Sequence, residues 1–258
     1  MRYVIGIIAT LAILMESPFA FAQSGGLSVE VCVAQGSGRV LCFAAGSKGN
    51  AAPVVTLSGT ATGILNASEV AFDSASRIYV SDVDTSPPSI RMYAPDADGD
   101  VASVAVIAGD NTTLIHPSDL RVDSAGYIYQ ADAGNGTTAT SAWDVFAPIA
   151  GLIGTYNVAP LQHCTDAGSN LLFPESIELH GSNVWVTGLG SNSAEEFSGA
   201  CNSAETPTVT IFGFNTTFDS PGGPRFDPAG NMWFVNVAGA DIVEFSAGAG
   251  QRGRLSRC

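Results

Sequence analysis

The stretch EVAFDSASRIYVSD at residues 69–82 recurs as DLRVDSAGYIYQAD at residues 119–132, without a gap and at an offset of 50 residues. Self-similarity at a fixed period is the signature of a repeat protein. In both copies two apolar, β-branched or aromatic runs flank an Asp-Ser-Ala turn, a pattern typical of a β-hairpin. The Asp side chain caps such a turn, and a Gly that follows adopts a positive φ. We therefore predict one hairpin in each copy.

Three less regular copies extend this pattern along the chain. One runs from PESIELH to NVWVT (residues 174–187), and another is PRFDPAGNMWFVN (residues 224–236). The copy at the start of the chain, residues 29–43, lacks its first strand. After each hairpin we predict a third strand that ends in an aromatic residue, namely Tyr93, Phe146, Phe212 and Phe245. A fourth, outer strand is predicted in two copies, at residues 54–57 and 104–107.

Four strands in about 50 residues are typical of a propeller blade, because one small sheet cannot bury both of its faces alone. We predict an all-β fold, a β-propeller of about five four-stranded blades. The first and last copies are incomplete, so a truncated six-bladed ring is the alternative. Aromatic residues recur at one position of the second strand and should form the core between blades. They are Tyr79, Tyr129, Trp185 and Trp233.

The repeated pattern has a known counterpart. Pro-x-x-apolar-x-apolar-Asp, then Ser/Pro-Ala-Gly, then Ile-Tyr-x-x-Asp resembles the NHL repeat, including that of bacterial secreted propellers. The resemblance covers most of residues 28–247 and implies a propeller fold. The fourth copy departs from it, with His180 where the third has Asp123. Because propellers host many activities, the resemblance implies little about function.

The N-terminal residues predict export. Arg2 precedes an uncharged apolar run at residues 4–15, and Ala20-Phe21-Ala22 supplies a small-x-small motif before Gln23. This is the pattern of a signal peptide, residues 1–22, cleaved after Ala22. The alternative, a membrane anchor, would need a longer apolar run. We expect a secreted or periplasmic protein with no membrane span after cleavage. Residues 23–247 would form a single propeller domain, and residues 248–258 an irregular tail.

The charge of the chain argues against one class of partner. The formal net charge is −14, and Lys48 is the one lysine. The one basic cluster is three arginines at the C-terminus, which are too few to neutralise a row of phosphates. We therefore expect no nucleic-acid binding.

Five cysteines in an exported protein predict disulfides. Cys32 and Cys42 flank a predicted hairpin turn, where a bridge between the two strands is plausible. Cys164 and Cys201 lie in two segments that interrupt the repeat, residues 161–172 and 189–206, and we predict that they pair. Cys258 is left over.

Acidic residues stand at the start of the first strand in three consecutive copies. They are Glu69, Asp119 and Glu175, of which Glu175 is one residue out of register. In a propeller this strand lines the central channel, so the carboxylates should converge and could hold Ca²⁺ or another divalent cation. Resemblance to gluconolactonase-like propellers implies a channel metal of this kind. The alternative is that they are solvated acids at loop ends.

Two function classes follow. The first is a noncatalytic binding scaffold that recognises a protein, glycan or small molecule at one face of the propeller. The second is a metal-dependent propeller enzyme, a hydrolase of lactones or a lyase, with Glu69, Asp119 and Glu175 at its site. The chain has no nucleophile elbow, Walker loop or His-Glu-x-x-His motif, and no individual catalytic residue is assigned. The scaffold is preferred because no histidine recurs near the acids.

Overall fold

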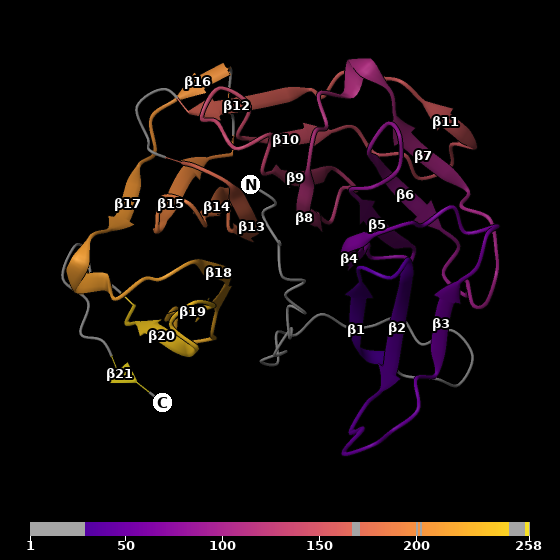
Figure 1. Ribbon diagram of the computed structural model, residues 1–258, viewed down its shortest axis with the longest axis horizontal. Helices are drawn as coiled ribbons and strands as arrows, with labels where there is room; N and C mark the ends of the chain where they lie inside the picture. The colour runs from indigo at the N-terminus through magenta and orange to yellow at the C-terminus, as the bar shows by residue number, and fades with distance from the viewer. Residues whose placement is uncertain (1–28, 167–170, 200, 202, 248–255, 258) are drawn as a thin grey trace, which may run out of the picture.

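The computed structural model describes residues 29–166, 171–199, 201, 203–247 and 256–257. Its strands form five sheets, which we call blades 1 to 5, placed one after another around a central axis (Figure 1). The chain is an all-β, five-bladed propeller, as the repeat predicts. The predicted signal peptide lies outside the described residues. No helix in the described part of the chain is long and apolar enough to cross a bilayer.

Blades 1 and 2 come first in the chain. Blade 1 has three strands, β1 (Val29–Gln35), β2 (Arg39–Ala44) and β3 (Val55–Ser58). Blade 2 has β4 (Ala67–Phe72), β5 (Ile78–Asp82), β6 (Ser89–Tyr93) and β7 (Ala105–Ala108), and β11 (Gly154–Tyr156) joins it from the next blade. Within the described residues the first blade therefore lacks an inner strand, as expected.

Blades 3 to 5 follow the same plan from the inner strand outward. Blade 3 has β8 (Pro117–Val122), β9 (Ile128–Asp132), β10 (Ala142–Phe146), β12 (Gln162–Asp166) and β16 (Ser203–Glu205). Blade 4 has β13 (Pro174–His180), β14 (Asn183–Gly188), β15 (Ser193–Ser198) and β17 (Val209–Phe212). Blade 5 has β18 (Pro221–Phe226), β19 (Met232–Asn236), β20 (Asp241–Phe245) and β21 (Ser256–Arg257). Two 3₁₀ turns, η1 (Asp110–Thr112) and η2 (Phe214–Thr216), follow β7 and β17.

The hairpin turns form as the sequence predicts. Asp73 Oδ1 accepts hydrogen bonds from the N–H groups of Ala75 and Arg77. The same pair of bonds, to the residues two and four positions later, is made by Asp123 and Asp227. The Asp side chain thus holds the turn that joins the first two strands of blades 2, 3 and 5.

Four apolar cores join the five blades. They lie between blades 1 and 2, 2 and 3, 3 and 4, and 4 and 5. The first described strands of the five blades contact each other in the order β1, β4, β8, β13 and β18, and no contact of comparable extent joins β18 to β1 within the described residues. Figure 1 shows the corresponding interval between blades 5 and 1. The described ring is therefore open on one side.

The recurring aromatic residues lie in these cores. Tyr79, Tyr129 and Trp185 pack between blades 2 and 3, 3 and 4, and 4 and 5, respectively. Trp233 holds the same position in blade 5 but is only half-buried and belongs to none of the four cores. Because its neighbour Phe234 lies in the core between blades 4 and 5, Trp233 points to the opposite face of blade 5, next to the interval in the ring. The prediction is thus confirmed for three of the four aromatics.

Blade 4 differs from the prediction in one respect. Val209–Phe212 is the outer strand of the blade, and the third strand is β15, with Phe197 as its core aromatic. The reason for the error is composition, because β15 carries Glu195 and Glu196 in the middle of a short strand. The side chain of Glu195 is fully buried, which a charged residue rarely is.

The two predicted disulfides are present. Cys32–Cys42 joins residues that lie opposite each other on β1 and β2, and Cys164–Cys201 has a Cα–Cα distance of 5.9 Å. Cys164 lies on β12, so the segment 161–172 is not only an insertion, since it includes the outer strand of blade 3. The bridge ties that strand to the connection between β15 and β17 of blade 4.

Candidate functional site

A β-bulge shapes the start of each complete inner strand. In β4 the register shifts between Ala67 and Glu69, and in β8 between Pro117 and Asp119. Bulges re-aim side chains and recur next to functional sites. The side chains that follow the bulges lie along the inner strands, which are the elements closest to the axis of the propeller (Figure 1).

The three acids predicted from the sequence lie near each other at this end of the inner strands. Glu69 and Asp119 occupy the same register position, opposite Ser81 and Ala131. Glu175 falls at the bulge of β13, one residue earlier, as the sequence indicates. The negative charge of Asp119 is close enough to raise the pKa of both Glu69 and Glu175.

Two arginines and a further glutamate lie next to these acids: Arg121 on β8, Glu178 on β13 and Arg225 on β18. Arg121 Nη1 lies 2.6 Å from Asp119 Oδ1, and its Nε lies 3.2 Å from Glu178 Oε2. Arg225 Nη1 lies 2.7 Å from the same Glu178 oxygen. These ion pairs link blades 3, 4 and 5. We call the whole set the inner-strand cluster: Glu69, Asp119, Arg121, Glu175, Glu178 and Arg225.

Two glutamates of the inner-strand cluster have strongly raised pKa values. Burial, followed by the charge of Asp119, raises the pKa of Glu69 to about 8. The same two causes raise the pKa of Glu175 to about 7. Both side chains keep some exposure to solvent, so these protons can exchange. Burial beside Asp119 thus favours the protonated form of Glu69, which can donate a hydrogen bond.

The buried partners show the opposing influences of burial and charge. Burial raises the pKa of Asp119, although Arg121 and Arg225 act against the rise. Burial disfavours the charged form of Arg121, but the negative charges of Asp119 and Glu178 outweigh the effect of burial and raise the pKa of this arginine. Burial and the charge of Arg121 lower the pKa of Arg225, although Glu178 acts against the fall. Arg121 Nη2 is buried and has no hydrogen-bond partner among the described residues.

The inner-strand cluster does not fit a divalent cation. One oxygen of Asp119 faces Arg121, and the other accepts the N–H of Ile177 at 3.0 Å. Two guanidinium groups lie among the acids and repel a cation. No group of three His, Cys, Asp or Glu side chains is arranged to hold a metal ion in the part of the chain that is described. Of the three predicted acids, Asp119 alone forms a salt bridge with an arginine within the described residues.

The sequence interpretation missed Arg121, Glu178 and Arg225. A signal for them was present, because all three occupy one repeat position, opposite the aromatic residue of the neighbouring strand. That position holds Ala71 in blade 2, so its polar character begins only with the third blade. The alignment of the copies could therefore have revealed a ring of charge beneath the acids.

Comparison with known proteins supports the fold alone. No protein-family model and no curated protein sequence matches the chain, so the NHL resemblance gains no support from a family model. A protein of unknown function from Bacteroides caccae superposes with a TM-score of 0.58 and 12% identity, over 87% of this chain and 70% of that one. The WD40 β-propeller domain of Doa1 matches with a TM-score of 0.58 and 10% identity, over 88% and 64%.

A third structure is an enzyme. The periplasmic gluconolactonase of Pseudomonas aeruginosa matches with a TM-score of 0.58 and 14% identity, over 88% of this chain and 66% of that one. This chain therefore spans slightly less than two thirds of the Doa1 domain and of the gluconolactonase. At such identities the similarity establishes a β-propeller and leaves the activity open.

Proposed function

We propose that the chain is an exported, noncatalytic binding scaffold that holds a small, neutral, polyhydroxylated ligand, such as a sugar, at the inner-strand cluster. The observation that carries the proposal is the unpaired, buried Nη2 of Arg121. A buried donor without a partner is costly, and a ligand oxygen would relieve that cost. Glu69, with a pKa of about 8, supplies a second donor at neutral pH.

The charge balance of the inner-strand cluster favours a neutral ligand. Asp119 and Glu178 are paired with Arg121 and Arg225, so these four charges cancel. An anion would meet the four acids of the cluster, and a cation would meet its two arginines. Hydroxyl groups both donate and accept hydrogen bonds, and they match a mixed set of carboxyl and guanidinium groups.

Export is supported by two observations. The N-terminal sequence has the pattern of a signal peptide cleaved after Ala22. The described chain carries two disulfides, which persist in oxidising compartments. Detection of the mature N-terminus at Gln23 in a secreted or periplasmic fraction tests this part of the proposal.

Calorimetric titration of the purified chain with D-glucose, N-acetyl-D-glucosamine and myo-inositol tests ligand binding. We expect at least one of them to bind, and Arg121→Gln to weaken that binding by about tenfold or more, as expected when a charged hydrogen bond is lost. Arg39→Gln is the matched control, because Arg39 is exposed on blade 1. Absence of heat with all three probes, or equal affinity in Arg121→Gln, contradicts the proposal.

A second candidate is a propeller enzyme, a hydrolase of lactones or a lyase. The observation that favours it is the pair of pKa values, about 8 for Glu69 and about 7 for Glu175, which suit general acid and base catalysis near neutral pH. The probe is D-glucono-1,5-lactone, with proton release as the readout. Turnover of this lactone that disappears in Glu69→Gln would establish the enzyme and contradict the noncatalytic scaffold.

The metal-dependent form of this enzyme requires a separate test, since the inner-strand cluster does not fit a cation. Titration of the chain with CaCl₂ should give neither heat nor a shift of the melting temperature. Saturable binding that Asp119→Asn abolishes would establish a metal site against the geometry described above.

A further inference from the structure

The outer edges of blades 1 to 3 are covered in a consistent way. In each case the cover is the connection between the third and fourth strands of the next blade. Gly99, between β6 and β7, pairs in parallel with Leu57 of β3. Likewise β11, between β10 and β12, pairs in parallel with β7, and β16, between β15 and β17, pairs in parallel with β12. Figure 1 shows β11 beside β7 and β16 beside β12.

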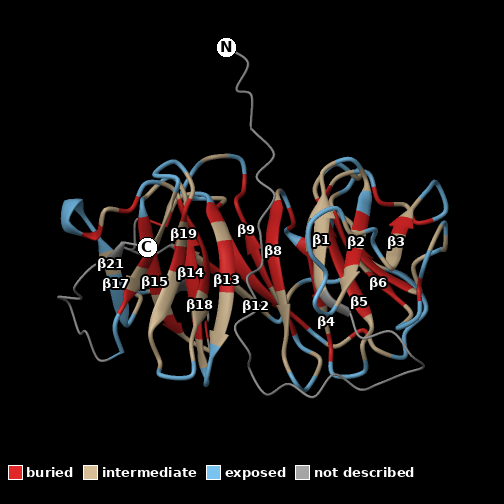
Figure 2. Ribbon diagram, turned by 90° about the horizontal axis from the view of Figure 1, so that it is seen from below, coloured by how far each residue is buried: buried red, intermediate tan, exposed pale blue. Residues whose placement is uncertain are grey.

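Blade 4 departs from this arrangement. Its outer strand, β17, is the last strand of its sheet among the described residues. Three of its four residues are exposed, whereas three of the four residues of β7 are buried. Figure 2 shows the exposed residues of β17 and of the following turn in pale blue. An open edge of this kind can accept another strand.

The backbone groups that β17 offers at its outer edge can be inferred from the outer strands of the other blades. One hydrogen bond to the carbonyl of the third strand begins the outer strand in blades 1 to 4. It runs from Val54 N–H to Cys42, from Val104 N–H to Met92, from Leu161 N–H to Val145 and from Thr208 N–H to Glu196. In blade 1 the covering residue, Gly99, donates to Thr56 at 2.9 Å and accepts from Ser58 at 3.2 Å. Thr210 and Phe212 stand at these two positions in β17. They therefore offer one carbonyl and one N–H to an incoming strand.

The turn after the outer strand also recurs. Gly59, Gly109 and Gly213 begin it, and each accepts a 2.7 Å bond from the hydroxyl of the threonine three residues later. In the first two turns a side chain of the covering segment sits over the glycine. Asp100 Oδ1 accepts the N–H of Ala61 at 2.6 Å, and Asn157 Oδ1 accepts the N–H of Asn111 at 2.8 Å.

The third turn has the same shape without the covering side chain. A Cβ on Gly59 would collide with Asp100, and a Cβ on Gly109 would collide with Asn157. At Gly213 no atom of the described residues lies within 4 Å of the corresponding point. The N–H of Asn215, which matches those of Ala61 and Asn111, faces this open space.

We propose that the β17 edge and the turn at Gly213–Thr216 form a docking site for an extended segment of a partner protein. The segment runs parallel to β17, and an Asp or Asn side chain on it accepts the N–H of Asn215. The chain's own connection in blade 5, residues 246–255, reads SAGAGQRGRL and contains neither Asp nor Asn. It therefore lacks the side chain that completes the two covered turns.

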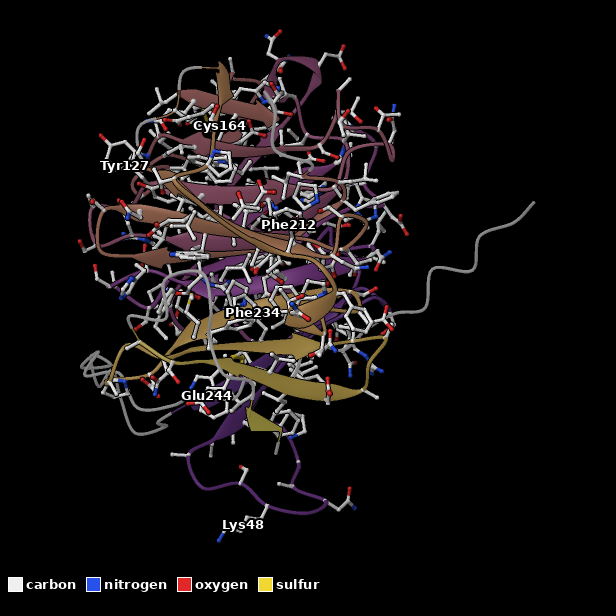
Figure 3. All side chains as sticks on the ribbon, turned by 90° about the vertical axis from the view of Figure 1, so that its left-hand side faces the viewer. Lys48, Tyr127, Cys164, Phe212, Phe234 and Glu244 are labelled. Carbon is white, nitrogen blue, oxygen red and sulfur yellow. A yellow bond between two sulfur atoms is a disulfide. The ribbon has the colours of Figure 1, made fainter. Side chains whose placement is uncertain are left out.

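The surroundings of the docking site indicate that, in the partner segment, apolar residues stand next to the Asp or Asn. Phe212 is 66% exposed and Phe214 is 98% exposed, next to an open groove of about 720 Å³ that Gly213 and Asn215 help to line. Figure 3 views the molecule from this side and labels Phe212. At the equivalent of Phe214, blade 2 has the polar Asp110. Recognition by strand addition combines such side-chain pockets with backbone hydrogen bonds.

A peptide copied from the chain itself provides the probe. The fluorescein-labelled peptide GLIGTYNVAP, residues 151–160, covers β7 and the turn at Gly109 in the folded chain. Fluorescence polarisation with the full chain should show saturable binding. Replacement of the peptide's Asn by Ala should weaken it about fivefold or more, because one hydrogen bond is lost. Phe214→Asp in the protein should weaken it similarly, while Leu65→Asp, at another exposed apolar site, should not.

Three results would overturn the docking site. They are no binding up to the solubility limit of the peptide, equal binding of the Asn→Ala peptide, and equal binding to Phe214→Asp. Because Phe214 is almost fully exposed, its replacement should leave the fold intact, which circular dichroism checks. The site lies on the outer rim and the inner-strand cluster on the inner strands, so failure of one proposal does not decide the other.

Discussion

Glu69 and Asp119 share one repeat position but differ in their partners. Asp119 pairs with Arg121, whereas Glu69 forms no salt bridge within the described residues, because blade 2 has Ala71 where blade 3 has Arg121. Burial beside a like charge then favours the protonated form of Glu69. Ala71, two residues further along the same strand, thus leaves Glu69 without the arginine partner that Asp119 has.

The raised pKa of Glu69 predicts how stability depends on pH. Since the folded state holds this proton more tightly than the unfolded chain, the stabilisation is complete below 4.5, the ordinary pKa of a glutamate in an unfolded chain. It is lost as the pH rises from there to about 8. Glu69→Gln, which keeps a neutral side chain at every pH, should therefore flatten the fall in melting temperature between pH 5 and about 8.

Differential scanning calorimetry across this range measures the effect. Asp96→Asn is the control, because Asp96 is exposed. Parallel pH profiles for the wild type and Glu69→Gln would show that Glu69 ionises normally in the folded state.

Ser118 shows how a single hydroxyl group joins two blades. Its Oγ lies 3.0 Å from the carbonyl of Ala131 in its own blade and 2.6 Å from that of Pro174 in the next. Ser118→Ala should lower the free energy of unfolding by about 1–3 kcal/mol, since it removes the hydrogen bond to the carbonyl of Pro174 across the interface. Urea denaturation measures this, with the exposed Ser124→Ala as the control. A loss equal to that of the control would show that the bond to Pro174 does not stabilise the interface between the blades.

At the scale of the strand, local chemistry decided what the sequence could predict. The hairpins were predictable because their Asp turns are local, and the disulfide at Cys32 because its partner lies across one hairpin. The third strand of blade 4 was not, since Glu195 and Glu196 conceal its apolar pattern. The ion pairs of Arg121 and Arg225 join different blades, and repeat spacing alone does not reveal such partners.

The two disulfides should differ in their contribution to stability. Cys164–Cys201 closes a sequence separation of 37 and Cys32–Cys42 one of 10. Chain-entropy estimates give about 4 kcal/mol for the longer loop and about 3 kcal/mol for the shorter. In urea denaturation, replacement of both Cys164 and Cys201 by Ala should therefore lower the free energy of unfolding more than replacement of both Cys32 and Cys42. The reverse order would mean that packing around the cysteines, rather than loop closure, dominates.

At the scale of the molecule, the described ring has four inter-blade cores for five blades. This arrangement predicts unequal roles for two equivalent tryptophans. Trp185→Ala removes a buried side chain from the core between blades 4 and 5 and should cost about 3–5 kcal/mol. Trp233→Ala, at the face next to the interval, should cost clearly less in the same denaturation experiment. Equal losses would show that the face of Trp233 is covered as well.

The most direct test of the open rim, which is the central structural claim, is hydrogen–deuterium exchange of the outer strands. Connections from the next blade cover β7 and β12, so their amides should exchange slowly. The amides of β17 should exchange at least about tenfold faster, because no strand of the described residues pairs with its outer edge. Protection of β17 equal to that of β7 and β12 in the isolated chain would contradict the open edge.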